Sequence, residues 1–254
     1  MSIERAALVA ALDELLSAKS ISDYCPNGLQ VEGRSNIQRV ATAVTACQAA
    51  IDEAIAWQAD ALLVHHGYFW KGEFEPVVGM KRQRLATLLA ADLNMLAYHL
   101  PLDYHFELGN NTTLGHCLQE YLPPFTMHPG SADHPIWQGV FEQPCDAQVL
   151  RRGIELALDR SCVWVAADDS LVKRFGWCTG GAQGFIDQAA VLGLDAYISG
   201  EISEKTTHSA REQKIHYFAA GHHATERGGV QALGAWLERE FGLEHRFIDI
   251  PNPA

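Results

Sequence analysis

The sequence lacks the features that would place the protein in a membrane or in a disulfide-bonded, secreted class. No stretch of its 254 residues approaches the roughly 20 consecutive apolar residues that a membrane-spanning helix needs. Glu4 and Asp13 interrupt the apolar pattern at the N-terminus, which favours an amphipathic helix over a signal peptide. The six cysteines form no Cys-x-x-Cys pair and are too sparse for a disulfide scaffold. We therefore expect reduced thiols and a cytoplasmic location.

Basic residues are also scarce. The chain has 19 Lys and Arg against 31 Asp and Glu, which gives a formal net charge of −12. A uniformly acidic protein is a poor candidate for binding a nucleic-acid backbone or an anionic membrane, so we expect neither as a partner. A small phosphorylated substrate in a local pocket stays compatible with this charge. Histidines, by contrast, number 12, which is high for this length.

Apolar segments of strand length alternate with amphipathic helical segments. We expect strands at about 39–44, 61–64, 95–98, 172–178, 196–199 and 216–220. Thr45 and Gln48 have the spacing of a capping box that opens the helix after the first of these strands. The stretch 123–135 is rich in Pro, Gly and Ser and predicts a linker. The alternation of strands and helices predicts an α/β fold with largely parallel sheets and flanking helices.

The two halves of the sequence look like copies of one another. With residue 45 set against residue 180, the segments 45–67 and 180–202 align without a gap and share Gln, Ile, Asp and Ala at matching positions. Self-similarity of this kind indicates an internal duplication. We therefore expect two similar α/β domains, a first repeat at 1–125 and a second at 126–254.

Histidines and carboxylates follow the expected strands. These residues are His65 and His66 after one strand, His99 and Asp103 after the next, Glu201 after a third, and His222 and Glu226 after the last. In the repeat, His99 falls on His222 and Asp103 falls on Glu226. Because ligands bind beyond the carboxyl ends of parallel strands, we expect these side chains to gather in one place. Imidazole and carboxylate groups suit zinc, iron or manganese.

The two adjacent histidines suggest more than one ion. Neighbouring side chains on an extended segment point to opposite sides, so His65 and His66 would serve two neighbouring ions more easily than one. Two ions about 3.5–4 Å apart lower the pKa of a water that they share. Each pattern alone also has a structural interpretation, as polar residues at a turn or an i,i+4 surface pair. The Gly-rich turn 180–184 similarly fits a plain tight turn or a phosphate cradle at a helix N-terminus.

Several motifs resemble, in their order along the chain, those of one known family. The segments NGLQVEG, LLVHHGYFW, YHLPLD, SGEIS and GHHATERGG are similar to those of the NIF-three-like family of dinuclear-metal proteins, whose bacterial members are commonly named GTP cyclohydrolase 1 type 2 homologs. The resemblance implies that His65, His66, Asp103, His222 and Glu226 are metal ligands and that Glu226 bridges two ions. It also implies a toroidal homohexamer in which each chain consists of two intertwined α/β domains.

Three hypotheses for function follow. The first is a metal-dependent hydrolase, similar to GTP cyclohydrolase 1 type 2, that acts on a nucleotide or a related small molecule, with His99 and Glu201 as catalytic residues that move protons. Its cofactors would be two divalent ions per chain, and the absence of thiolate ligands leaves iron, manganese, zinc and nickel open. The second is a non-catalytic metal-binding or regulatory ring protein. The third, a ring that encircles DNA, is opposed by the net charge of −12.

Overall fold

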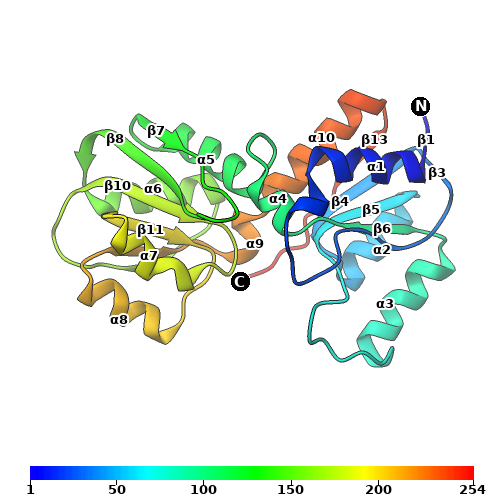
Figure 1. The fold of residues 1–254 in the computed structure, drawn as a ribbon, viewed down its shortest axis with the longest axis horizontal. Coiled ribbons are helices and arrows are strands. Elements are labelled where there is room, and N and C mark those ends of the chain that lie inside the picture. Colours follow the sequence, from blue (N-terminus) through cyan, green and yellow to red (C-terminus); the bar gives the residue numbers. More distant parts are fainter. The chain divides into compact units, whose positions relative to one another are not determined.

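The computed structural model describes residues 1–254, which divide into two compact units (Figure 1). Unit 1 is Met1–Gly109 with Gly229–Pro251, and unit 2 is Asn110–Gly228 with Asn252–Ala254. The chain passes from one unit to the other three times. The two units are defined by which residues pack together, whereas the predicted repeats at 1–125 and 126–254 are defined by similarity within the sequence. The division into these two repeats stays a prediction.

Unit 1 is built around a five-stranded sheet with helices on both faces. The strand order is β13 (Glu244–Phe247), β4 (Arg39–Thr45), β5 (Ala61–His66), β6 (Asn94–Ala97) and β2 (Gly28–Val31). Neighbouring strands from β13 to β6 pair in parallel, and β2 pairs antiparallel with β6. Helices α1 (Arg5–Leu15) and α10 (Arg227–Phe241) cover one face, and α2 (Gln48–Ala56) and α3 (Gly79–Ala90) cover the other (Figure 1).

The apolar strands of unit 1 explain why both faces are covered. Successive side chains of a strand point to opposite faces, so an unbroken apolar run needs a partner on each side. Val40 and Val44 of β4 belong to the core under α1 and α10, whereas Ala41 and Ala43 belong to the core under α2 and α3. The remaining elements of this unit are the paired short strands β1 (Ile3–Glu4) and β3 (Asn36–Ile37), the 3-10 turn η1 (Ala18–Ser20) and α4 (Leu100–Tyr104).

Unit 2 has the same layers around a six-stranded sheet. The strand order is β7 (Phe125–His128), β8 (Trp137–Cys145), β10 (Val172–Cys178), β11 (Ala196–Ser199), β12 (His216–Ala219) and β9 (Val163–Val165). The three strands β10, β11 and β12 are parallel, and the flanking strands pair antiparallel. Helices α5 (Asn110–Tyr121) and α6 (Ala147–Leu158) pack on one face, and η2 (Gln183–Phe185), α7 (Ile186–Val191) and α8 (Glu204–Glu212) lie on the other side, with α9 (His222–Thr225) after β12. The predicted α/β class is confirmed.

One hydrogen-bonding pattern occurs in both units and supports the internal duplication. The Asp60 carboxylate precedes β5 and accepts two backbone N–H groups at the start of β4, at 2.7 and 2.9 Å. Asp195, its counterpart in the sequence repeat, precedes β11 and accepts two backbone N–H groups at the start of β10, both at 2.8 Å. The parallel strands β4–β5–β6 and β10–β11–β12 therefore share the same strand order and the same carboxylate-to-backbone hydrogen bonds between their first two strands.

Two local predictions were wrong. The expected linker 123–135 contains strand β7, because Phe125 is buried against the rings of Phe141 and Phe175, at 5.9 and 5.0 Å between centroids. The expected capping box at Thr45 does not form, since α2 has Cys47 at its N-cap position and no side-chain cap. The Thr45 hydroxyl instead lies 3.2 Å from the Nδ1 atom of His66. In both cases a contact with a residue distant in the sequence replaces the role that the local pattern predicted, a linker at Phe125 and a helix cap at Thr45.

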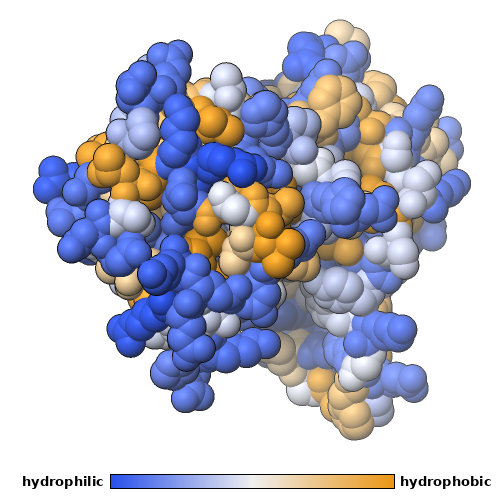
Figure 2. Space-filling model, turned by 60° about the vertical axis from the view of Figure 1, so that its left-hand side comes forward, coloured by the Kyte–Doolittle hydropathy of each residue, from blue (hydrophilic) through white to orange (hydrophobic).

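The face of the molecule shown in Figure 2 is largely polar. Hydrophilic residues cover most of the face in Figure 2, and hydrophobic residues form separate patches among them. The longest helices are too short and too polar to cross a lipid bilayer. All six cysteines are free thiols.

Candidate metal centre

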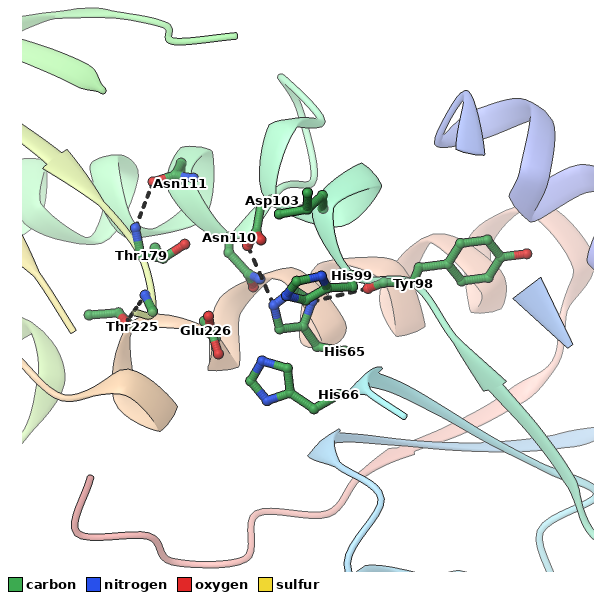
Figure 3. Close-up of polar contacts among 12 residues, drawn as sticks. His65, His66, Tyr98, His99, Asp103, Asn110, Asn111, Thr179, Thr225 and Glu226 are labelled. Carbon is green, nitrogen blue, oxygen red and sulfur yellow. Dashed lines mark hydrogen bonds and ion pairs between the residues drawn. The ribbon is translucent and has the colours of Figure 1, made fainter. Parts of the chain in front are cut away.

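His65 is the most deeply placed of the predicted ligands. It lies near the end of β5 with a fully buried side chain, and its Nδ1 atom is 3.0 Å from the backbone carbonyl oxygen of Tyr98 (Figure 3). Because a carbonyl oxygen only accepts hydrogen bonds, Nδ1 carries a proton, and in a neutral imidazole Nε2 then keeps its lone pair. Nε2 lies 3.5 Å from the Asp103 carboxylate. The side chain is therefore held in the tautomer that can bind a metal ion.

His66 turns towards its neighbour. The rings of His65 and His66 have centroids 4.5 Å apart, tilted by 42°. The expectation that adjacent side chains point to opposite sides is thus wrong for these two residues, which are the last two of β5. The Nδ1 atom of His66 is the one that lies beside the Thr45 hydroxyl. Both histidines at this strand end consequently have a partner for Nδ1.

His99 joins the same group from the next strand. It follows β6, its ring is buried, and its centroid lies 5.0 Å from that of His65 and 5.7 Å from that of His66. One ring nitrogen from each of the three histidines lies within 4.8 Å of the others. Asp103, one turn further on in α4, is also buried. Unit 1 therefore brings together all four of its candidate residues.

Asp23 supports this group and was not singled out from the sequence. Its carboxylate accepts hydrogen bonds from His99 Nδ1 at 2.9 Å, Asn27 Nδ2 at 3.0 Å and the Leu100 backbone N–H at 2.9 Å. Burial alone would raise the pKa of Asp23, but the hydrogen bonds from His99 and Asn27 hold it well below its ordinary value. The sequence around Asp23 predicts only a turn, so no local signal could have assigned this contact.

Unit 2 presents one histidine between two carboxylates. His222 begins α9, its Nδ1 atom lies 2.7 Å from Glu201 and its Nε2 atom lies 3.3 Å from Glu226. Burial lowers the pKa of His222, but Glu226 and Glu201 outweigh it and raise the pKa to about 9. Glu226 is buried, whereas Glu201 is partly exposed. The structure thus brings together all three residues that the sequence proposed in this half.

The Gly-rich turn lies against these residues as a tight turn. Gly180 has a φ of +69°, and a Cβ atom there would collide with Glu226 Oε1. The Gly180 backbone N–H donates to the Thr225 hydroxyl at 3.1 Å, and its carbonyl oxygen accepts from the Gly200 backbone N–H at 2.9 Å. The backbone of Gly180 is therefore already hydrogen-bonded within the protein, and the close approach to Glu226 explains the glycine.

Comparison with known proteins gives full-length matches. The Duf34/NIF3 (NGG1p interacting factor 3) family model matches residues 3–253. A GTP cyclohydrolase 1 type 2 homolog of Pseudomonas aeruginosa is 52% identical over 100% of both chains, and one of Vibrio cholerae is 54% identical over 97% of this chain and 98% of the relative. A solved structure described as protein ybgI, of unknown function, superposes with a TM-score of 0.93 at 50% identity and covers 99% of this chain and 100% of its own. A structure from Thermus thermophilus gives a TM-score of 0.87 at 32% identity with the same coverage.

Proposed function

The chain belongs to the Duf34/NIF3 family, and we propose that it binds two divalent metal ions and uses them to hydrolyse a nucleotide or a related small molecule. The proposed metal ligands are His65, His66, Asp103, His222 and Glu226. The names of the curated relatives make GTP the first substrate to test.

One observation carries the proposal: the candidate ligand histidines all have a partner at Nδ1. The partners are the Tyr98 carbonyl for His65, the Thr45 hydroxyl for His66 and the Glu201 carboxylate for His222. Metal-binding histidines in proteins typically hold their second nitrogen in this way, which fixes the ring and leaves Nε2 for the ion.

The donor set fits divalent ions of the first transition series. It contains imidazole nitrogens and carboxylate oxygens without thiolate, which suits iron, manganese, zinc or nickel. Asp103 and Glu226 are buried carboxylates that would offset the positive charge of the ions. When bound, two such ions would lower the pKa of a water and polarise the bond to be hydrolysed.

The protein's own residues would orient the ligands and move protons. Glu201 accepts a hydrogen bond from His222 Nδ1, so it would fix the tautomer of that proposed ligand. Because Glu201 is also partly exposed to solvent, we propose that it takes part in proton transfer. His65 is fully buried, so it would shield an ion bound to it from bulk water. The homohexamer and the cytoplasmic location stay predictions, the former testable by light scattering of the purified protein.

The test is metal analysis of the purified protein followed by a hydrolysis screen. The protein would be stripped, reloaded separately with Mn²⁺, Fe²⁺, Zn²⁺ and Ni²⁺, and incubated with GTP and a nucleotide library. An Asp103→Asn variant serves as control, since it keeps the size of a proposed ligand and removes its charge. We expect turnover by the reloaded protein that the variant lacks. A fully metal-loaded protein that hydrolyses nothing would favour the alternative, a non-catalytic metal-binding or regulatory ring protein.

A further inference from the structure

We infer that His99 is itself a ligand of one of the metal ions, oriented for that role by Asp23. This inference rests on the proposed function, because it adds a sixth ligand to the proposed site. It replaces the proton-transfer role that the sequence suggested for His99.

The internal repeat places His99 where the second copy has a ligand. His99 follows β6 and precedes α4, and its repeat counterpart His222 follows β12 and begins α9. Each histidine is followed four residues later by a buried carboxylate, Asp103 in one unit and Glu226 in the other. The two copies thus carry the same pair of donors on the same element.

The hydrogen bonds of the two histidines are also chemically alike, although Asp23 and Glu201 are not counterparts in the repeat. His99 Nδ1 lies 2.9 Å from an Asp23 oxygen, and His222 Nδ1 lies 2.7 Å from a Glu201 oxygen. An ionised carboxylate only accepts, so in both residues Nδ1 is the donor when the imidazole is neutral and Nε2 keeps its lone pair. A carboxylate behind the imidazole is the usual outer partner of a metal-binding histidine. The local chemistry that supports His222 as a ligand therefore applies equally to His99.

Asp23 and Asn27 hold the whole residue, not only its ring. The Asn27 side-chain oxygen accepts from the His99 backbone N–H at 2.7 Å, and Asp23 accepts from the next backbone N–H, that of Leu100, at 2.9 Å. Asp23 thus acts as the N-terminal cap of α4, the helix that carries Asp103, in place of a cap from His99 itself. A single buried carboxylate consequently fixes His99 and the start of the helix on which Asp103 lies.

Two aromatic rings complete the surroundings of His99. Tyr24 and Trp70 each meet its ring edge to face, with centroids 5.0 Å away and interplanar angles of 75° and 86°. With Nδ1 held by Asp23 and the ring flanked by these side chains, Nε2 is the atom left for the group formed with His65 and His66. The three histidine nitrogens, within 4.8 Å of one another, are close enough to share one ion or serve two adjacent ions.

The experiment measures metal affinity and coordination directly. Wild type, His99→Ala and Asp23→Asn would be stripped and titrated with Co²⁺ against a chromophoric chelator, with metal content and the visible cobalt spectrum as readouts. His116→Gln is the matched control, because it removes an exposed histidine of α5. We expect His99→Ala to lose one ion or to alter the cobalt spectrum with an affinity loss beyond about 100-fold, and Asp23→Asn to weaken binding by about 10–100-fold.

The outcomes separate this inference from the proposed function. If wild type binds no metal, the proposed function and the inference both fail. If wild type binds two ions and His99→Ala binds two ions with unchanged affinity and spectrum, only the inference is overturned. Circular dichroism excludes misfolding as the cause of a loss. Asp23→Asn gives a second test, since it keeps the histidine and the size of its partner: unchanged affinity in that variant would also contradict the assignment.

Discussion

The strongest prediction concerns competition between a metal ion and a proton at His222. Glu226 and Glu201 raise the pKa of His222 to about 9 in the metal-free protein, so at pH 7 its imidazole is protonated on both nitrogens. An ion that binds Nε2 must displace that proton. At two pH units below the pKa, only about one molecule in 100 has the lone pair available, which corresponds to about 3 kcal/mol at about 1.36 kcal/mol per unit.

Metal affinity should therefore rise with pH while the stability of the metal-free protein falls. A group with a raised pKa stabilises the fold fully below its unfolded pKa of 6.5, and this contribution is lost as the pH rises through about 9. We expect the affinity for Mn²⁺ to rise about tenfold per unit between pH 6.5 and 8.5, and the melting temperature of the stripped protein to decrease over the same range.

The assay is Mn²⁺ titration with a competing chelator at each pH, together with thermal melts of stripped protein. Glu201→Gln is the matched variant, because it keeps a hydrogen-bond acceptor beside Nδ1 and removes one of the two charges that raise the pKa. Its affinity should depend less steeply on pH than that of wild type. Equal slopes in both proteins, or an affinity that does not change with pH, would refute the assignment of His222 as the group that exchanges a proton for the ion.

Three further predictions concern the same elements. Glu226→Gln should bind fewer than two ions per chain by metal analysis, because the loss of the buried charge leaves the repulsion between the ions uncompensated; full occupancy would contradict a bridging role. Gly180→Ala should destabilise the protein by about 1–3 kcal/mol in urea unfolding and weaken metal binding, since its Cβ would meet Glu226, whereas Gly184→Ala, in open space, should change neither. Asp195→Ala should reduce the unfolding free energy by about 1–3 kcal/mol because two backbone N–H groups lose their acceptor, and Asp60→Ala should cost a similar amount if the two ties are equivalent.

The sequence predicts the parts of the fold that depend on local pattern. The runs around 61–64 and 196–199 are apolar without alternation, which indicates strands covered on both faces, and the structure has β5 and β11 there. The sequence has histidines directly after such strands, and parallel strands end at a common edge of the sheet. This was enough to predict that His65, His66 and His99 lie together, as they do. The duplication strengthened this step, since chance polar residues would not recur at matching positions.

The contacts that orient these residues could not be predicted, because they join segments far apart in the chain. Asp23 reaches His99 across 76 residues, and Thr45 reaches His66 across 21. Local pattern assigned Thr45 to a helix cap and the segment around Asp23 to a turn. A side-chain oxygen is suited to either kind of partner, and only the folded chain decides between a nearby N–H group and a distant imidazole.

The two copies differ at the positions of the histidine pair. In the alignment, His65 and His66 correspond to Gly200 and Glu201. A Cβ atom at Gly200 would come within 2.6 Å of the Gly180 carbonyl oxygen and of the His222 Cα atom, so no side chain fits at that position in unit 2. The space that the His65 side chain takes in the first copy is filled in the second by the backbone of Gly180 and His222. Unit 1 therefore has a histidine at this position, whereas unit 2 has a glycine there, followed by the carboxylate of Glu201. This steric difference explains how two copies of one fold come to present different candidate ligands.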